Sequence, residues 1–137
     1  MDENNASTAF GRTRHFRELL VWPKAMTLAK DVYRETEMLP PKELYGLQSQ
    51  MRRAAVSVPS NIAEGHGRLD DRHFRQFLAF SRGSLFELET QLELAAGLNL
   101  LSDARSAELI CQCEEAARMI NGLLASLDSR KLPALTC

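Results

Sequence analysis

The chain has 137 residues, a formal net charge of −1 and an isoelectric point near 6.3, and 45% of its residues are hydrophobic. That length fits one domain with a sizeable core, and the nearly neutral charge argues against a dedicated nucleic-acid-binding protein. No apolar run reaches the roughly 18 residues that a membrane span needs. We therefore expect a cytoplasmic protein with no membrane partner.

Both ends are expected to lie outside the folded domain. The first residues, MDENNASTAF, place acids where a signal peptide needs basic and apolar residues. We predict a disordered leader over residues 1–15, a folded domain over 16–129 and a flexible tail over 130–137. The odd number of cysteines, Cys111, Cys113 and Cys137, favours the reduced thiols of a cytoplasmic protein over disulfides.

A first helix is predicted from Pro23, because proline is favoured at the first position of a helix. It should end near the LPPKE segment, since proline disfavours helical geometry in the residue before it. Its apolar face, chosen by helical spacing, comprises Met26, Ala29, Val32, Tyr33 and Thr36.

A second helix is predicted from about Tyr45 to Glu64, although Pro59 lies inside it. The apolar stripe keeps its register across the proline, which favours a kinked helix over the alternative, a break with a new helix starting at Pro59. Gly65 and Gly67 are expected to end the helix in the left-handed conformation. The stripe comprises Leu47, Met51, Ala54, Ala55, Val58 and Ile62, and the side chains suited to bonding the freed backbone groups are Ser57, Ser60 and Asn61.

Two further helices complete the predicted fold. The third begins at Asp70 or Asp71 and reaches about Gly97, and the fourth has Ser102 as its N-cap. The third helix's core stripe is Phe74, Phe77, Leu78, Ser81, Leu85, Leu88, Leu92 and Ala95, and the fourth's is Ile110, Cys113, Ala117, Ile120, Leu124 and Leu127. The alternating spacings of three and four in the last set are typical of left-handed bundles. The sequence predicts an all-α, up-down-up-down, left-handed four-helix bundle.

Polar and apolar residues away from these core stripes suggest contacts between copies of the chain. Residues 45–85 hold six arginines against three acids, whereas residues 86–129 hold eight acids against two arginines, so two copies offer complementary patches. The alternative is a solvated surface, with the serines satisfying the backbone near Pro59. The predicted interface residues are Arg53, Ser57, Ser60, Glu64, Arg75, Phe80, Arg82, Phe86, Glu89, Glu93 and Leu94.

Nothing in the sequence supports a catalytic site, a cofactor or a metal site. His15, His66 and His73 are not spaced as a pair on adjacent helix turns, and no glutamate is followed three residues later by a histidine, as a di-iron bundle needs. Phosphate-binding loops and nucleophile elbows are also missing from the sequence. We expect a protein that is not an enzyme.

RNA or another nucleic acid is an alternative partner, because arginines concentrate in the second and third helices. The candidate residues are Arg52, Arg53, Arg68, Arg72, Arg75 and Arg82. A small ligand held between helices is a third hypothesis, since bundles can contain such sites.

Three stretches carry a resemblance to a known family: ELLVWPKAMTLAKDVY, YGLQSQMRRAAVSVPSNIAEGHGR and RQFLAFSRGSLFELETQLELA. Over residues 16–125 the chain resembles the 23S rRNA intervening-sequence proteins. The resemblance implies a four-helix bundle that assembles into a cyclic homopentamer, and it implies no catalytic residues. A similar bundle serves as a nucleic-acid-binding accessory in diversity-generating retroelements. We therefore predict a non-enzymatic, homo-oligomeric scaffold or adaptor.

Overall fold

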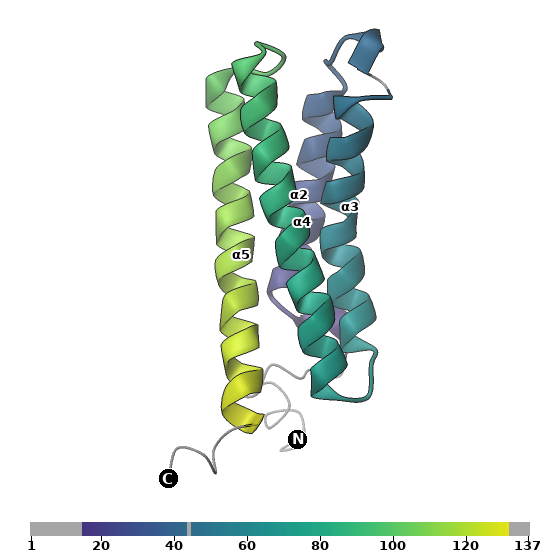
Figure 1. The fold of residues 1–137 in the computed structure, drawn as a ribbon, viewed down its shortest axis with the longest axis vertical. Helices are drawn as coiled ribbons and strands as arrows, with labels where there is room; N and C mark the ends of the chain where they lie inside the picture. Colours follow the sequence, from purple (N-terminus) through teal and green to yellow (C-terminus); the bar gives the residue numbers. More distant parts are fainter. Residues whose placement is uncertain (1–14, 44, 132–137) are drawn as a thin grey trace.

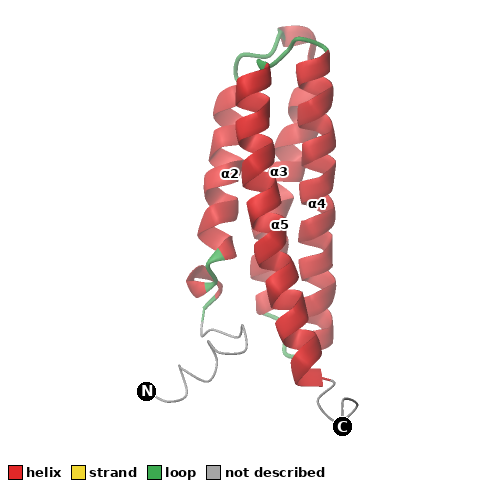
Figure 2. Cartoon of the chain, turned by 90° about the vertical axis from the view of Figure 1, so that its left-hand side faces the viewer, coloured by secondary structure: helices red, strands yellow, loops and turns green. Residues whose placement is uncertain are grey.

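The computed structural model describes residues 15–43 and 45–131. Four long helices, α2 (Val21–Thr36), α3 (Leu47–His66), α4 (Asp71–Gly97) and α5 (Asp103–Lys131), lie alongside one another (Figure 1). Two short 3₁₀ helices, η1 (Phe16–Glu18) and η2 (Pro41–Glu43), precede α2 and α3. Figure 2 shows only helices and loops over the described residues, which confirms the predicted all-α fold with four helices.

The folded part extends slightly beyond the predicted domain. His15 caps η1 by accepting a hydrogen bond from the backbone N–H of Arg17, and α5 continues to Lys131. The rest of the predicted leader and tail, residues 1–14 and 132–137, lies outside the described residues.

One apolar core runs between the four helices. Each of α2 and α4 packs against both α3 and α5. Removing one of the large core side chains from water contributes about 1.5–3 kcal/mol to stability. The largest fully buried ones include Leu28, Met51, Ile62, Phe74, Leu78, Leu85, Leu88, Leu92, Leu109, Ile120 and Leu127.

The predicted apolar face of the first helix is rotated from the one that the structure buries. Leu28 and Ala25 face the core, whereas Met26 is half-buried and Tyr33 is exposed. The predicted face and the buried face share Ala29, Val32 and Thr36. Spacing alone therefore did not determine how the helix is rotated about its axis. The helix also starts two residues before Pro23, which is tolerated because N–H groups in the first turn have no intrahelical acceptor.

The later stripes were predicted more closely. All six predicted residues of α3 and seven of the eight in α4 are buried, with Phe77 half-buried. In α5, Ile110 and Leu124 are half-buried, and the predicted stripe lacks three buried residues, Ser106, Leu109 and Ala116.

Helix α3 passes through Pro59 without interruption, so the alternative of a break there is wrong. The hydroxyl of Ser57 donates to the carbonyl of Ala54 (2.8 Å), and the amide of Asn61 donates to the carbonyl of Ser57 (2.8 Å). These side chains bond carbonyls close to the proline, although not that of Ala55, which loses its usual donor. Ser60 is exposed. The bend at Pro59 stays a prediction.

Helix α3 ends differently from the prediction. Gly65 lies inside the helix and is buried, and Gly67 caps it with a right-handed φ of −74°. Among the non-glycine residues that the structure describes, the left-handed one is instead Asn99 (φ 61°) after α4. There the N–H of Leu100 bonds the carbonyl of Ala95 (2.8 Å), and that of Asn99 bonds Ala96 (3.0 Å), which forms a Schellman motif.

The predicted N-cap at Ser102 is confirmed, and Asp70, one of the two residues at which the third helix was expected to begin, is the N-cap of α4. Asp70 accepts a hydrogen bond from the backbone N–H of His73 (2.8 Å) at the start of α4. This bond, with the further contact to the His73 ring, lowers the pKa of the Asp70 carboxyl. Ser102 accepts from the backbone N–H of Arg105 (3.1 Å) at the start of α5.

Gly65 permits the close approach of α3 and α4. A Cβ atom at this position would lie 2.6 Å from the Cβ of Phe77 and 3.2 Å from the Cδ1 of Phe74. We predict that Gly65→Ala lowers the free energy of unfolding by about 1–3 kcal/mol, because a packed interior does not absorb an added methyl group without strain. Urea unfolding measures the change. The matched control is Gly122→Ala in exposed helix, where a Cβ meets nothing within 4 Å, and it should stabilise by about 1 kcal/mol. Equal effects of the two substitutions would contradict the packing argument.

Candidate functional site

Part of the predicted polar flank of α3 is an internal seam against α4. The hydroxyl oxygen of Ser57 hydrogen-bonds that of Ser84, and the buried Ser81 hydroxyl donates to the carbonyl of Val58 (2.8 Å). Small hydroxyl side chains let the two backbones approach and satisfy polar groups between them. Ser57, which was predicted at a contact between copies, therefore contributes to a seam between two helices of one chain.

The other members of that flank face outward. Arg53, Ser60 and Glu64 are exposed, and Glu64 forms an ion pair with Arg68 (3.0 Å) one turn later. The Arg68 guanidinium also lies 4.8 Å from the centroid of the Phe77 ring, so it covers part of an apolar side chain.

Helix α4 carries an apolar surface that the fold does not cover. Phe80, Phe86 and Leu94 are each about half-exposed, at 49%, 53% and 52%. Between them lies Gly83, where an added Cβ atom would meet nothing within 4 Å. Glycine inside a helix costs about 1 kcal/mol relative to alanine, and no contact within the chain requires it here. We call Phe80, Gly83, Phe86 and Leu94 the outward face of α4.

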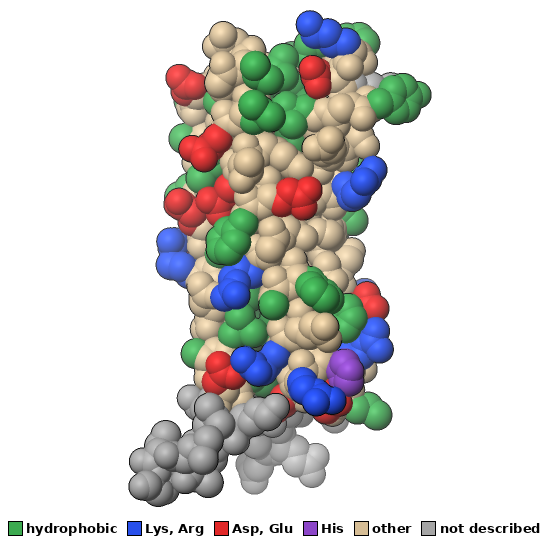
Figure 3. Space-filling view, viewed as in Figure 1, with side chains coloured by type: hydrophobic (Ala, Val, Ile, Leu, Met, Phe, Trp, Pro, Cys, Tyr) green, Lys and Arg blue, Asp and Glu red, His purple; other side chains and the backbone are tan. Residues whose placement is uncertain are grey.

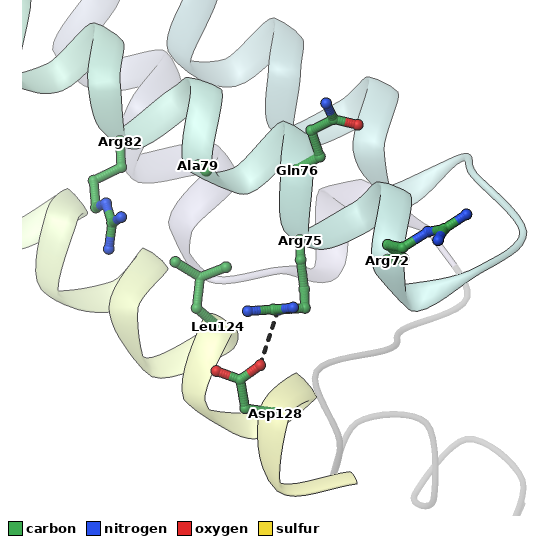
Figure 4. A pocket seen from close by; sticks show the side chains of 7 residues that line it. All are labelled: Arg72, Arg75, Gln76, Ala79, Arg82, Leu124 and Asp128. Carbon is green, nitrogen blue, oxygen red and sulfur yellow. Dashed lines mark ion pairs between the residues drawn. The ribbon is translucent and has the colours of Figure 1, made fainter. Parts of the chain in front are cut away.

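Three arginines from the first half of α4 line a hollow of about 400 Å³ against α5, together with Leu124 and Asp128 (Figure 4). The Nε of Arg75 lies 2.9 Å from Asp128 Oδ1, an ionic contact without hydrogen-bond geometry. Arg82 donates to the side-chain oxygen of Asn121 (2.8 Å). Arg72 points away from Asp128 (Figure 4). We call this the arginine hollow.

The second half of α4 is acidic, and the line along which α4 and α5 meet on the surface is called the groove below. Burial raises the pKa of the Glu89 carboxyl, and the nearby charges of Glu114 on α5 and Glu93 add to the shift. Figure 3 shows how the charged side chains are distributed on one face of the molecule. Basic side chains lie mainly over the lower half of α4 and α5, and acidic ones mainly over the upper half. The groove therefore runs from a positive to a negative end.

The six arginines proposed for nucleic-acid binding do not form one surface. Arg72, Arg75 and Arg82 line the arginine hollow, whereas Arg52 and Arg53 line a different hollow beside Tyr33. Arg52 is also occupied within the chain. Its Nε donates to Thr36 Oγ1 (2.9 Å), and its Nη2 donates to the carbonyl of Tyr33 (3.1 Å) and to Glu37 Oε1 (3.0 Å).

The described cysteines do not provide an activated nucleophile. Cys113 faces the core, and burial, with the charges of Glu89 and Glu114, raises the pKa of its thiol to about 12. Cys111 is exposed, and Cys137 lies outside the described residues. Over residues 15–43 and 45–131, no cluster of three or more His, Cys, Asp or Glu side chains is placed to hold a metal ion. In the same part of the chain, no helix has the length and apolar character to cross a bilayer.

Comparison with known proteins places the chain in a family. A protein-family model described as 23S rRNA-intervening sequence protein matches residues 17–122, most of the bundle. The chain belongs to this family. Its fold is similar to the crystal structure of a protein with unknown function from the S23 ribosomal protein family of Bacteroides thetaiotaomicron VPI-5482. The TM-score is 0.69 at 17% sequence identity, over 76% of this chain and 97% of that one, so the likeness concerns the fold. No curated protein matches the sequence.

Family membership thus confirms the resemblance seen in the sequence, but it does not indicate which function this chain performs. The solved relative is itself described as having unknown function. The features that bear on function are those of this chain's own surface: the outward face of α4, the groove with opposite charges at its ends, and the hollows that contain arginine.

The two described cysteines should differ strongly in reactivity. Alkylation of the native protein at neutral pH should modify Cys111 rapidly and Cys113 far more slowly, because the thiolate is the nucleophile and Cys113 is both buried and protonated. Mass spectrometry of peptides from timed reactions measures the two rates. In denaturant the rates should converge, and rapid native labelling of Cys113 would contradict its position in the core.

Proposed function

We propose that this family member is a non-enzymatic scaffold or adaptor that acts in the cytoplasm as a homo-oligomer. In this proposal the subunit is a left-handed, up-down-up-down bundle, and five subunits form a ring, the number that the family resemblance implies. The observation that carries the proposal is the uncovered outward face of α4.

A second copy of the chain would account for this face. Phe80, Phe86 and Leu94 leave large apolar groups half in water, and covering a Phe or Leu side chain contributes up to about 1.5–3 kcal/mol. Gly83 leaves room for close approach of another helix, which offsets its cost within an isolated α4. Aromatic residues in the centre of such a surface are typical of strong protein contacts.

The charges along α4 and α5 support the same partner. A copy that presents its acidic end, around Glu89 and Glu93, to the arginine hollow of its neighbour would pair opposite charges head to tail, as a ring of five requires. Such pairing guides which surfaces meet and fixes their orientation more than it adds affinity. Arg75 and Arg82 already hold partners on α5, so the neighbour would add to existing pairs.

Nucleic-acid binding is the second candidate function, and the arginine hollow is the observation that favours it. Three guanidinium groups within three turns of one helix suit successive phosphates. Two features oppose this function. Arg75 is paired with Asp128 and Arg82 is bonded to Asn121, and the acidic end of the groove lies next to these arginines. The expected signature is RNA binding that falls steeply as salt is raised.

We predict that the purified protein has the mass of an oligomer in solution and that Phe86→Asp converts it to a monomer. A charge in the centre of an apolar contact must be desolvated, which opposes association strongly. Light scattering coupled to size exclusion measures the mass.

The matched control is Leu69→Asp, because Leu69 is fully exposed in the turn before α4 and lies off the outward face. Leu69→Asp should leave the mass unchanged, and circular dichroism should show that both variants stay helical. A monomeric unaltered protein would overturn the proposed function. An oligomer that both variants preserve would show that a different surface forms the contact.

Charge reversal tests which ends of the groove meet. Arg72→Glu and Glu93→Lys should each weaken association by roughly tenfold at low salt and less at high salt, because exposed charges are screened. Combining both reversals in one chain should restore association. Arg72 is preferred to Arg75 and Arg82, whose reversal would disturb their contacts with Asp128 and Asn121. If neither single reversal changes the strength of association, this charge pairing is excluded. The apolar contact is then tested by Phe86→Asp alone.

A further inference from the structure

A second hollow lies far along the bundle from the arginine hollow, where α2 ends and α3 begins. It is a shallow depression open to solvent, with a volume of about 430 Å³, and it is lined by Tyr33, Tyr45, Gln48, Ser49, Arg52 and Arg53. Its volume falls within the range of about 300–1,000 Å³ that is typical of small-molecule sites. None of these six lining residues is acidic.

Two of its walls are planar groups that suit an aromatic ligand. The Arg52 guanidinium lies 4.5 Å from the centroid of the Tyr33 ring. Its hydrogen bonds to Thr36, to the Tyr33 carbonyl and to Glu37 hold the guanidinium over the ring. The other aromatic residue of the lining, Tyr45, is 91% exposed, which is unusual for a tyrosine ring. A planar base stacks favourably on tyrosine rings and guanidinium planes.

The same hollow has a positive end. Gln48 and Ser49 belong to the first turn of α3, where backbone N–H groups have no intrahelical acceptor. The N-cap, Gly46, offers no side-chain acceptor, while the Glu43 carboxylate accepts from the N–H of Leu47 (3.3 Å) and the Glu43 carbonyl from that of Gly46 (3.1 Å). Arg53 lies one turn after Ser49 and is exposed. Because the Arg52 charge is already paired with Glu37 (3.0 Å), Arg53 supplies the charge for one anionic group.

We propose that this hollow binds a nucleotide through its base and its phosphate. The base stacks against Tyr45 and the Tyr33–Arg52 pair, and the phosphate lies at the start of α3 within reach of Arg53. Ser49 and Gln48 offer hydrogen-bonding groups between the two. The ligand is either a free nucleotide or the phosphorylated end of a single strand. This site is separate from the arginine hollow and does not depend on the assembly proposed above.

Isothermal titration of the full chain with AMP, UMP, adenosine and ribose 5-phosphate tests the proposal. Both nucleotides should bind, and the two fragments, each of which lacks the base or the phosphate, should bind at least about tenfold more weakly. A 5′-phosphorylated single-stranded oligonucleotide distinguishes the two sources, because tighter binding than UMP identifies a strand end and equal or weaker binding identifies a free nucleotide.

Two substitutions connect any binding to this hollow. Tyr45→Ala and Arg53→Ala should each lower nucleotide affinity by about fivefold or more, whereas Tyr45→Phe should retain it, since stacking needs the ring and not the hydroxyl. The controls are Met38→Ala, an exposed apolar residue of the same connection, and Arg72→Ala in the arginine hollow. Three results would each overturn the proposal. They are no detectable binding up to about 10 mM nucleotide, an equal affinity for ribose 5-phosphate, and loss of binding in Arg72→Ala but not in Tyr45→Ala or Arg53→Ala.

Discussion

The close contact between α3 and α4 is the constraint on which the other features depend. Gly65 admits the backbone of α4 near Phe77, and Ser57, Ser81 and Ser84 continue the approach with hydrogen bonds. The seam runs past Pro59, and the carbonyl of the preceding residue, Val58, accepts a hydrogen bond from Ser81 of the neighbouring helix. Packed side chains in fixed rotamers hold the two helices in one register.

That register decides what α4 shows to the outside. With Phe74, Leu78, Leu85 and Leu92 in the core, the remaining surface of a 27-residue helix necessarily includes Phe80, Gly83 and Phe86. The same rotation directs Arg75 and Arg82 to α5. The outward apolar face and the groove with opposite charges therefore follow from one packing choice, and so both would change together if α4 turned about its axis.

A second constraint acts at the opposite end of the bundle, through buried polar groups. The side chain of Gln48 donates to the carbonyl of Thr36 (2.7 Å), and Arg52 bonds the hydroxyl of Thr36 and the carbonyl of Tyr33, so α3 satisfies the last turn of α2. Cations are favoured at this end of a helix. Hydrophobic spacing could not reveal this cluster, since it treats Gln48 and Arg52 as surface residues. The cluster also fixes the walls of the hollow beside Tyr33.

The sequence by itself determined the number of helices, most of their core stripes, the start of α4 near Asp70 and the cap at Ser102, because these depend on periodicity and on hydrogen bonds between residues a few positions apart. It also identified the family from three contiguous stretches. Only the tertiary structure decided the phase of α2, the burial of Gly65 and the separation of the six arginines onto different surfaces. Those properties depend on which neighbour a side chain meets, and residues distant in the chain supply the neighbour.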